Sequence, residues 1–308
     1  MAIYYITTIL SMLIWSASYV FTDICYGVMS PIQVAAVRSL ITTGILGAVL
    51  LGGKLLGKLR QKKYKTAAES ALNAEKHTKK DMVWVYVSGL LGITLYTILE
   101  NYGVRFTTTA NSALVVASFP AITVLFELLI YKMKPTFAKS AGIILAIAGV
   151  MVLTGLSSET GENPLWGNIC LIAAGVTWAF YSFTTRKVTD KFPSLTLTFY
   201  QMLGSTVFYI PFVLAEGAEW KPWTPDVTGS VLFLCIGCSF AALILYNFGL
   251  RKLSAGISAV FLNLIPVFGV VCSALIAKET ITPPQLIGGA VVIAGVLLSC
   301  APERTKES

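Results

Sequence analysis

Long apolar runs, separated by short polar stretches, cover almost the whole 308-residue chain. Each run holds about 20 residues with few charges, the length that an α-helix needs to cross a bilayer, whereas barrel strands need only about 10 alternating residues. The pattern therefore predicts an all-α integral membrane protein with ten transmembrane helices, the first of them retained and not cleaved as a signal peptide. The predicted spans are residues 3–22, 31–52, 82–103, 109–131, 137–156, 165–184, 194–214, 227–249, 254–277 and 284–301.

The composition fits this class, because 56% of residues are hydrophobic and only 12% are charged, against about 45–50% and about 25% in soluble domains. The net charge of +8 comes mostly from the loops on one face, which hold about 19 Lys and Arg residues against about three on the other. Basic loops stay in the cytoplasm, so both termini are predicted to be cytoplasmic. The charge is thus no sign of a nucleic-acid partner.

The basic loop 54–81 carries nine of these Lys and Arg residues. Such a juxtamembrane cluster can attract anionic lipid, at roughly 1 kcal/mol per basic residue near the surface. It can equally serve only to anchor the topology.

The two halves of the chain repeat one another. With a shift of 146 residues, NYGVRF at 101 aligns with NFGLRK at 247, and AGIILAIAGV at 141 with IGGAVVIAGV at 287. The earlier spans align at a shift near 162, because the basic loop adds length to the first half. Residues 1–156 and 157–308 are therefore two five-helix repeats, and an odd number of helices inverts the second repeat in the membrane.

A proline lies at the same point of both repeats, Pro120 in the fourth span and Pro266 in the ninth. Proline kinks a helix and frees a backbone carbonyl, which is tolerated where neighbours or a polar cavity satisfy that group. We expect the two prolines to bend paired helices that face a central cavity. The alternative is the ordinary frequency of proline in membrane helices.

Three ionisable residues within the spans are candidates for function, since a charge in the hydrocarbon core is costly without a cavity or partner. Arg38 could bind a substrate carboxylate through two hydrogen bonds, or could pair structurally. Glu100 could bind an amine or carry a proton, or could extend to the interface beside Arg105. Glu127 is close in sequence to Lys132 at the inner end of its span and has the weakest case.

Aromatic and amide side chains suit a pocket for a small amphipathic or cationic ligand, through stacking and cation–π contacts. Trp15 and Trp178 are repeat partners well inside their spans, away from the interfacial belts. Core packing is the competing explanation for each member of the set. The predicted cavity residues are Trp15, Tyr19, Arg38, Tyr96, Glu100, Trp178, Tyr181, Tyr200, Gln201, Tyr246, Asn247 and Asn263.

No metal, cofactor or nucleotide is expected. Cys235 and Cys238 form a CxxC, but His77 is the sole histidine and lies in a loop, so the six cysteines are interpreted as small buried side chains. GGKLLGKL at 52 begins like a phosphate-binding loop, but Leu59 stands where Ser or Thr must reach magnesium. Transport, if it occurs, would then be gradient-driven or facilitated.

The chain resembles the EamA-type members of the drug/metabolite transporter superfamily over nearly its full length. The resemblance rests on WSASYV at 15, on Pro31 and Arg38 as P-x6-R, on Pro266 followed by AKETITPP at 277, and on G-x6-G at 142 and 288. It implies two inverted five-helix repeats in a bacterial-type plasma membrane, with the fifth and tenth helices outside a central cavity. The first half departs from the acidic residue that is usual in the family after the fourth helix: Met133 stands there, whereas Glu279 stands at the matching position of the second half.

The resemblance implies export of small metabolites by alternating access, and we expect an amino-acid-like or amine cargo. Other cargo classes stay open, namely nucleosides, sugar phosphates, quaternary amines and drugs. An integral membrane enzyme acting on lipid-linked substrates, and a receptor or scaffold, are rival classes. The enzyme would need acid, base or metal groups concentrated at one membrane face, which the sequence lacks. The sequence does not indicate the oligomeric state.

Overall fold

The computed structural model describes residues 1–60, 78–107, 109–154, 163–217, 219–276 and 282–300. Within these ranges the side chains at 19, 23, 54–60, 109–111, 114 and 273–276 are excluded from the description. The basic loop, the predicted lipid contact, therefore lies mostly outside the described residues. All the regular structure in the described part is helical.

The first half of the chain forms α1 Ala2–Ser16, α2 Ser18–Tyr26, α3 Pro31–Arg60, α5 Lys79–Gly89, η1 Leu90–Leu95, α6 Tyr96–Phe106, α7 Thr109–Ala117, α8 Phe119–Tyr131 and α9 Phe137–Thr154. The second half forms α10 Pro164–Arg186, α11 Ser194–Glu216, α12 Pro225–Phe233, η2 Leu234–Ala242, α13 Leu243–Gly249, α14 Ala255–Val260, η3 Phe261–Asn263, α15 Leu264–Ile276 and α16 Pro283–Ser299. Most of these elements coincide with the predicted apolar runs to within a few residues, but α3 continues to Arg60, eight residues beyond the predicted span 31–52.

Eight helical stretches of the described residues are long and apolar enough to cross a membrane. They are 2–26, 31–53, 79–106, 137–154, 164–186, 194–216, 225–249 and 255–272. Two further apolar helices, Val115–Tyr131 and Pro283–Ser299, are shorter. The first of these lies within the fourth predicted span, 109–131, which a break at Ser118 divides.

The chain forms two compact units. One contains Met1–Thr7, Ser18–Ile98 and Phe180–Lys252, and the other contains Thr8–Ala17, Leu99–Ala179 and Leu253–Ser308. Each unit thus takes segments from both halves of the sequence, so the units do not coincide with the predicted repeats, which stay a prediction.

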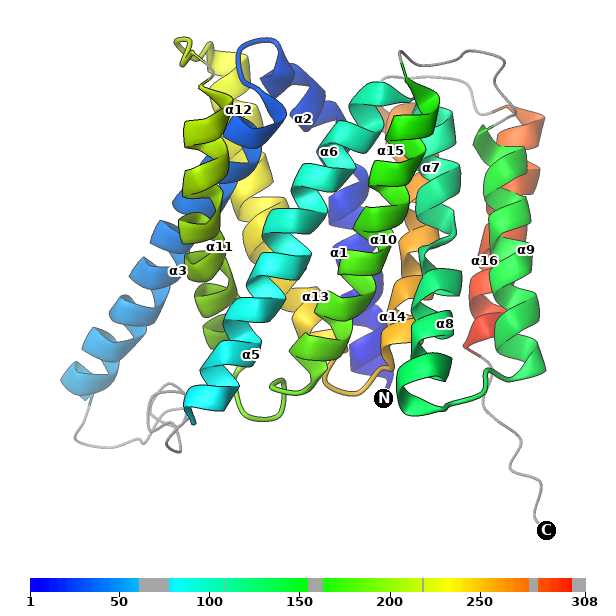
Figure 1. Cartoon of the computed structure of the whole chain (residues 1–308), viewed down its shortest axis with the longest axis horizontal. Coiled ribbons are helices and arrows are strands. Elements are labelled where there is room, and N and C mark those ends of the chain that lie inside the picture. Colours follow the sequence, from blue (N-terminus) through cyan, green and yellow to red (C-terminus); the bar gives the residue numbers. More distant parts are fainter. Residues whose placement is uncertain (61–77, 108, 155–162, 218, 277–281, 301–308) are drawn as a thin grey trace. The chain divides into compact units, whose positions relative to one another are not determined.

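The first unit is built on α3 and α11, which pack against each other (Figure 1). α3 also contacts η2, and α11 contacts η1. η1 and η2 are π-helical segments, in which a wider turn loosens the backbone hydrogen bonding. In each segment one backbone carbonyl accepts a hydrogen bond from a side-chain hydroxyl. Tyr209 Oη donates to Ile93 O at 2.8 Å, and Thr42 Oγ1 donates to Cys235 O at 3.3 Å. Shifted by 146 residues, η1 falls within η2, so both halves widen their helices at matching positions.

In the second unit α9 and α16 run side by side (Figure 1) and make the most extensive helix pair there. Glycines allow their backbones to approach closely, as is common where helices associate in lipid. A Cβ added at Gly142 would lie 2.5 Å from the carbonyl oxygen of Gly295, and one at Gly295 would lie 2.6 Å from the nitrogen of Ala146. These glycines belong to the two G-x6-G motifs, and the contact explains why a side chain cannot replace them.

Candidate functional site

The predicted cavity residues fall into both units. Trp15, Glu100, Trp178 and Asn263 belong to the second, and the remaining members belong to the first. The side chain of Tyr19 lies outside the described part of the chain. Tyr96 begins α6 and Glu100 follows one turn later, both partly exposed, and the ring of Tyr200 packs against Phe192 and Phe199.

The structure brings the repeat partners Trp15 and Trp178 together in the second unit. Their ring centroids are 5.7 Å apart and the ring planes cross at 78°, the edge-to-face arrangement that aromatic pairs favour. Trp178, on α10, is 4% exposed, whereas Trp15, on α1, is more open. One tryptophan from each half thus contributes to the same aromatic surface.

Two apolar runs of the second unit are interrupted at matching positions of the two halves. The fourth apolar run breaks at Ser118, between α7 and α8, and Pro120 is the second residue of α8. The ninth run passes from α14 through the 3₁₀ turn η3 into α15, where Pro266 is the third residue. Residue 118 shifted by 146 is 264, the first residue of α15, so the interruptions are in register.

Asn263 lies in η3, at the interruption of the ninth run. It is 1% exposed, and neither its Nδ2 nor its Oδ1 has a hydrogen-bond partner among the described residues. The hydroxyl of Ser258, on α14, is likewise buried without a partner there. Leaving such groups unpaired costs about 1–3 kcal/mol each, because burial removes the water that would bind them.

The buried amides Gln201 and Asn247 of the first unit, in contrast to Asn263, have hydrogen-bond partners. Gln201, on α11, donates from Nε2 to Ser88 Oγ at 2.8 Å and to Thr185 Oγ1 at 3.0 Å. Asn247, on α13, donates from Nδ2 to Gln201 Oε1 at 2.8 Å and to Thr198 Oγ1 at 3.0 Å. We call these five residues, with Tyr181, the amide network.

Tyr181 completes the amide network by donating from its hydroxyl to Asn247 Oδ1 at 2.6 Å. Its ring stacks beside that of Tyr246 at a centroid distance of 6.3 Å, and the Tyr246 hydroxyl lies 3.4 Å from Ser182 Oγ. Tyr181, Gln201, Tyr246 and Asn247 are all 0% exposed. A cargo could reach their polar atoms only by breaking bonds that already exist inside the protein.

Arg38 lies on α3 and is partly exposed. Its Nε donates to Ser239 Oγ, on η2, at 3.3 Å, and this is the one hydrogen bond of its guanidinium within the described residues. The two terminal nitrogens keep the paired geometry that suits a carboxylate. Cys235 and Cys238 of the CxxC lie on the same segment as buried free thiols.

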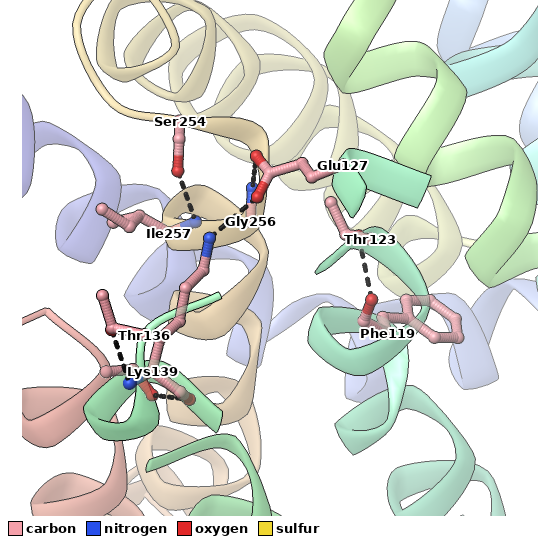
Figure 2. Close-up of polar contacts among 9 residues, drawn as sticks. Phe119, Thr123, Glu127, Thr136, Lys139, Ser254, Gly256 and Ile257 are labelled. Carbon is pink, nitrogen blue, oxygen red and sulfur yellow. Dashed lines mark hydrogen bonds and ion pairs between the residues drawn. The ribbon is translucent and has the colours of Figure 1, made fainter. Parts of the chain in front are cut away.

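Glu127 differs most from its expected position. It is buried, and its partner is Lys139 on α9, not the nearby Lys132: Lys139 Nζ lies 2.8 Å from Glu127 Oε2. Glu127 Oε1 also accepts from the backbone N–H of Gly256 at 2.8 Å, so one carboxylate joins α8, α9 and α14 (Figure 2). A Cβ at Gly256 would lie 2.6 Å from Glu127 Oε2, and glycine therefore leaves room for the ion pair.

Sequence reasoning missed Lys139 and Gly256 as members of this cluster. Lys139 lies inside the predicted span 137–156, and a charged residue at that position was the available signal. At the matching position of the second half Gln285 accepts from the backbone N–H of Thr282 at 2.9 Å and caps its own helix. The ion pair is thus a feature of the first half.

Three proteins that are named as transporters or exporters are similar to this chain along most of its length. An "Uncharacterized transporter" of Archaeoglobus fulgidus is 26% identical over 96% of this chain and 96% of its own. The "Uncharacterized transporter YetK" of Bacillus subtilis is 28% identical, over 75% of this chain and 72% of its own. A "Probable terminal-alkyne amino-acid exporter" of Streptantibioticus cattleyicolor is 25% identical, over 75% of this chain and 77% of its own.

A solved crystal structure shares the fold. It superposes with a TM-score of 0.74 over 96% of this chain and 95% of that chain, at 19% identity. The model of the EamA-like transporter family matches residues 2–155 and again residues 165–301. Together these segments cover nearly the whole sequence. The chain is therefore a multi-pass membrane protein that belongs to the EamA-like transporter family.

Proposed function

We propose that the protein is a secondary transporter that exports small amino-acid-like or amine metabolites by alternating access. It would need no ATP. Its ten membrane helices form two inverted five-helix repeats, 1–156 and 157–308, in a bacterial-type plasma membrane with both termini in the cytoplasm. The name of the Streptantibioticus relative supports the amino-acid class and the direction.

The observation that carries the proposal is the matched interruption of the fourth and ninth apolar runs. Because the helices are interrupted at equivalent positions, each repeat has a hinge at the same place. Exchange of conformations between inverted repeats exposes one site alternately to each side of the membrane. The matched π-helical segments η1 and η2 support the same relation, because they widen the third and eighth runs at equivalent positions.

The chemistry of the side chains supports a zwitterionic or cationic cargo. Trp15, the more open member of the tryptophan pair, offers an indole face for an ammonium group, and Trp178 packs against it. Arg38 offers two terminal nitrogens for a carboxylate. Tyr181, Gln201, Tyr246 and Asn247 have a different role in this proposal, which is to hold the helices of the first unit together while the cavity opens.

Counterflow in proteoliposomes tests transport and cargo class together. Vesicles preloaded with unlabelled amino acids or amines are expected to accumulate the labelled compound, and vesicles without protein are not. Accumulation of nucleosides or sugar phosphates instead would show that the cargo belongs to one of those classes. No counterflow with any class would contradict transport. Export is tested in cells, where expression should raise tolerance to toxic amino-acid analogues, and a lowered tolerance would indicate import.

Trp15→Ala is expected to abolish counterflow while the protein stays folded, because the aromatic surface loses its more open member. The matched control is Trp220→Ala, at a tryptophan that is 55% exposed. Wild-type rates in Trp15→Ala would contradict the placement of Trp15 at the cavity.

A further inference from the structure

Asn263 is exceptional among the buried amides of the described residues. Gln33, Gln201 and Asn247 are each bonded within the protein. Asn263 is equally buried, yet its donor and its acceptor both lack a partner among the residues that the structure describes. A buried polar group in that condition needs a reason, because it destabilises the fold that contains it.

The matching position in the first half shows that the fold does not require an amide there. Residue 263 less 146 is 117, and Ala117 ends α7 as a 2% exposed side chain. Both halves thus break their helix directly after this position, one with alanine and the other with asparagine. The break itself therefore cannot explain the asparagine.

The backbone around Asn263 is suited to a ligand. Pro266 has no N–H and cannot make the bond to the carbonyl of Leu262 that a continuous α-helix would have. η3 packs against α7, so the interrupted segments of both halves meet at the element that contains Asn263. An irregular backbone with polar groups at membrane depth is found where it is buried in protein or lines a cavity.

We propose that Asn263 determines specificity by binding the headgroup of an amino-acid cargo. Nδ2 donates to the cargo's carboxylate, and Oδ1 accepts from its ammonium group. An amide can make both contacts at once, from two different atoms, without a charge of its own. The inference rests on the proposed function, since it names the group that reads the cargo of that transporter.

The test compares wild type, Asn263→Ala and Asn263→Asp. Counterflow is measured in proteoliposomes with the twenty common L-amino acids and with the primary amines that lack their carboxylates. Asn263→Ala should raise the half-saturation concentration for the transported amino acid about tenfold, the loss expected for hydrogen bonds to charged groups. It should also raise the melting temperature without ligand, because an unpaired amide is removed.

Asn263→Asp keeps an acceptor for the cargo's ammonium group. In place of the amide nitrogen, it sets a second carboxylate oxygen next to the cargo's carboxylate, which repels it. Its ratio of amine to amino-acid transport should rise about tenfold over wild type. This ratio does not depend on how much protein folds, so it remains decisive if either variant expresses poorly.

Unchanged half-saturation in Asn263→Ala with an unchanged ratio in Asn263→Asp would overturn the inference and leave the transporter in place. A lower melting temperature in Asn263→Ala with unchanged half-saturation would also overturn it, since the amide would then be a structural group bonded through water. A wild-type protein that moves none of the amino acids or amines would instead contradict the proposed cargo class. The two failures are therefore distinguishable.

Discussion

Among the described residues, the buried amides of the first compact unit and the single one of the second, Asn263, are in opposite states. In the first unit Gln201 and Asn247 use their donors and acceptors on each other and on neighbouring hydroxyls. In the second unit Asn263 is as deeply buried, and within the described part of the chain neither its donor nor its acceptor has a partner. The residue type and the burial are alike, so the difference lies in what surrounds them.

The comparison separates two roles that amino-acid type alone does not distinguish. A completed network fixes one packing of its helices, because any movement breaks several bonds at once. An unpaired amide forms new hydrogen bonds when a ligand binds to it. We therefore expect substitutions of Gln201 or Asn247 to reduce the stability of the fold, and substitution of Asn263 to change the binding and transport of cargo.

The largest effect is expected at Glu127, a satisfied polar group inside the second unit. Glu127→Ala leaves the partly buried Lys139 without its partner, and the expected cost is about 3 kcal/mol, the lower end for breaking a buried pair. Thermal unfolding in detergent should show a large fall in melting temperature. The control is Glu127→Met with Lys139→Met, which removes both charges and should recover most of the loss. A single variant as stable as wild type would mean that the pair contributes nothing.

The next largest effect is expected from Asn247→Ala. It removes partners from the Tyr181 hydroxyl and from Gln201 Oε1, and the cost should be about 2–3 kcal/mol. The same substitution at Asn263 is the matched control and should not destabilise. The comparison fails if the two alanine variants lose stability equally in the same unfolding measurement.

The smallest effect is expected at two buried serines. Ser205 Oγ lies 2.9 Å from Thr94 Oγ1 in the first unit, so Ser205→Ala should cost about 1 kcal/mol. Ser258→Ala should be neutral or stabilising by about 0.5 kcal/mol, because its hydroxyl has no partner among the described residues. Denaturant unfolding of the two variants side by side measures the difference, and equal losses would show that the Ser258 hydroxyl is bonded in solution.

Much of the fold could be predicted from the sequence, because a membrane helix needs only a long apolar run. The spans 137–156 and 194–214 correspond to α9 and α11 with small changes at their ends. The matched prolines also marked the runs that the structure interrupts. The π-helical segments could not be foreseen, since LLGITL and LCIGCSFAA contain no residue that distinguishes a wide turn from an α-helical one.

The site was less accessible to sequence reasoning, because its content depends on partners that are distant in the chain. Nothing local distinguishes Asn247 from Asn263, and only the packing of α11 on α13 and of η3 on α7 separates them. The pairing of Glu127 with Lys139 was missed for the same reason. Trp15 and Trp178 were found together because the repeat, a property of the whole chain, related them.

The wide turn in η1 has a consequence for insertions and deletions. Each residue turns an α-helix by about 100°, and a π-helical turn accommodates one extra residue within the hydrogen-bonded ladder. Deleting one residue from Leu90–Leu95 and restoring regular α-helix would therefore rotate Tyr96 and the side chains after it by about a quarter turn relative to α5. The length of this short segment, more than the identity of any residue in it, sets which side chains the second half of the helix presents to its neighbours.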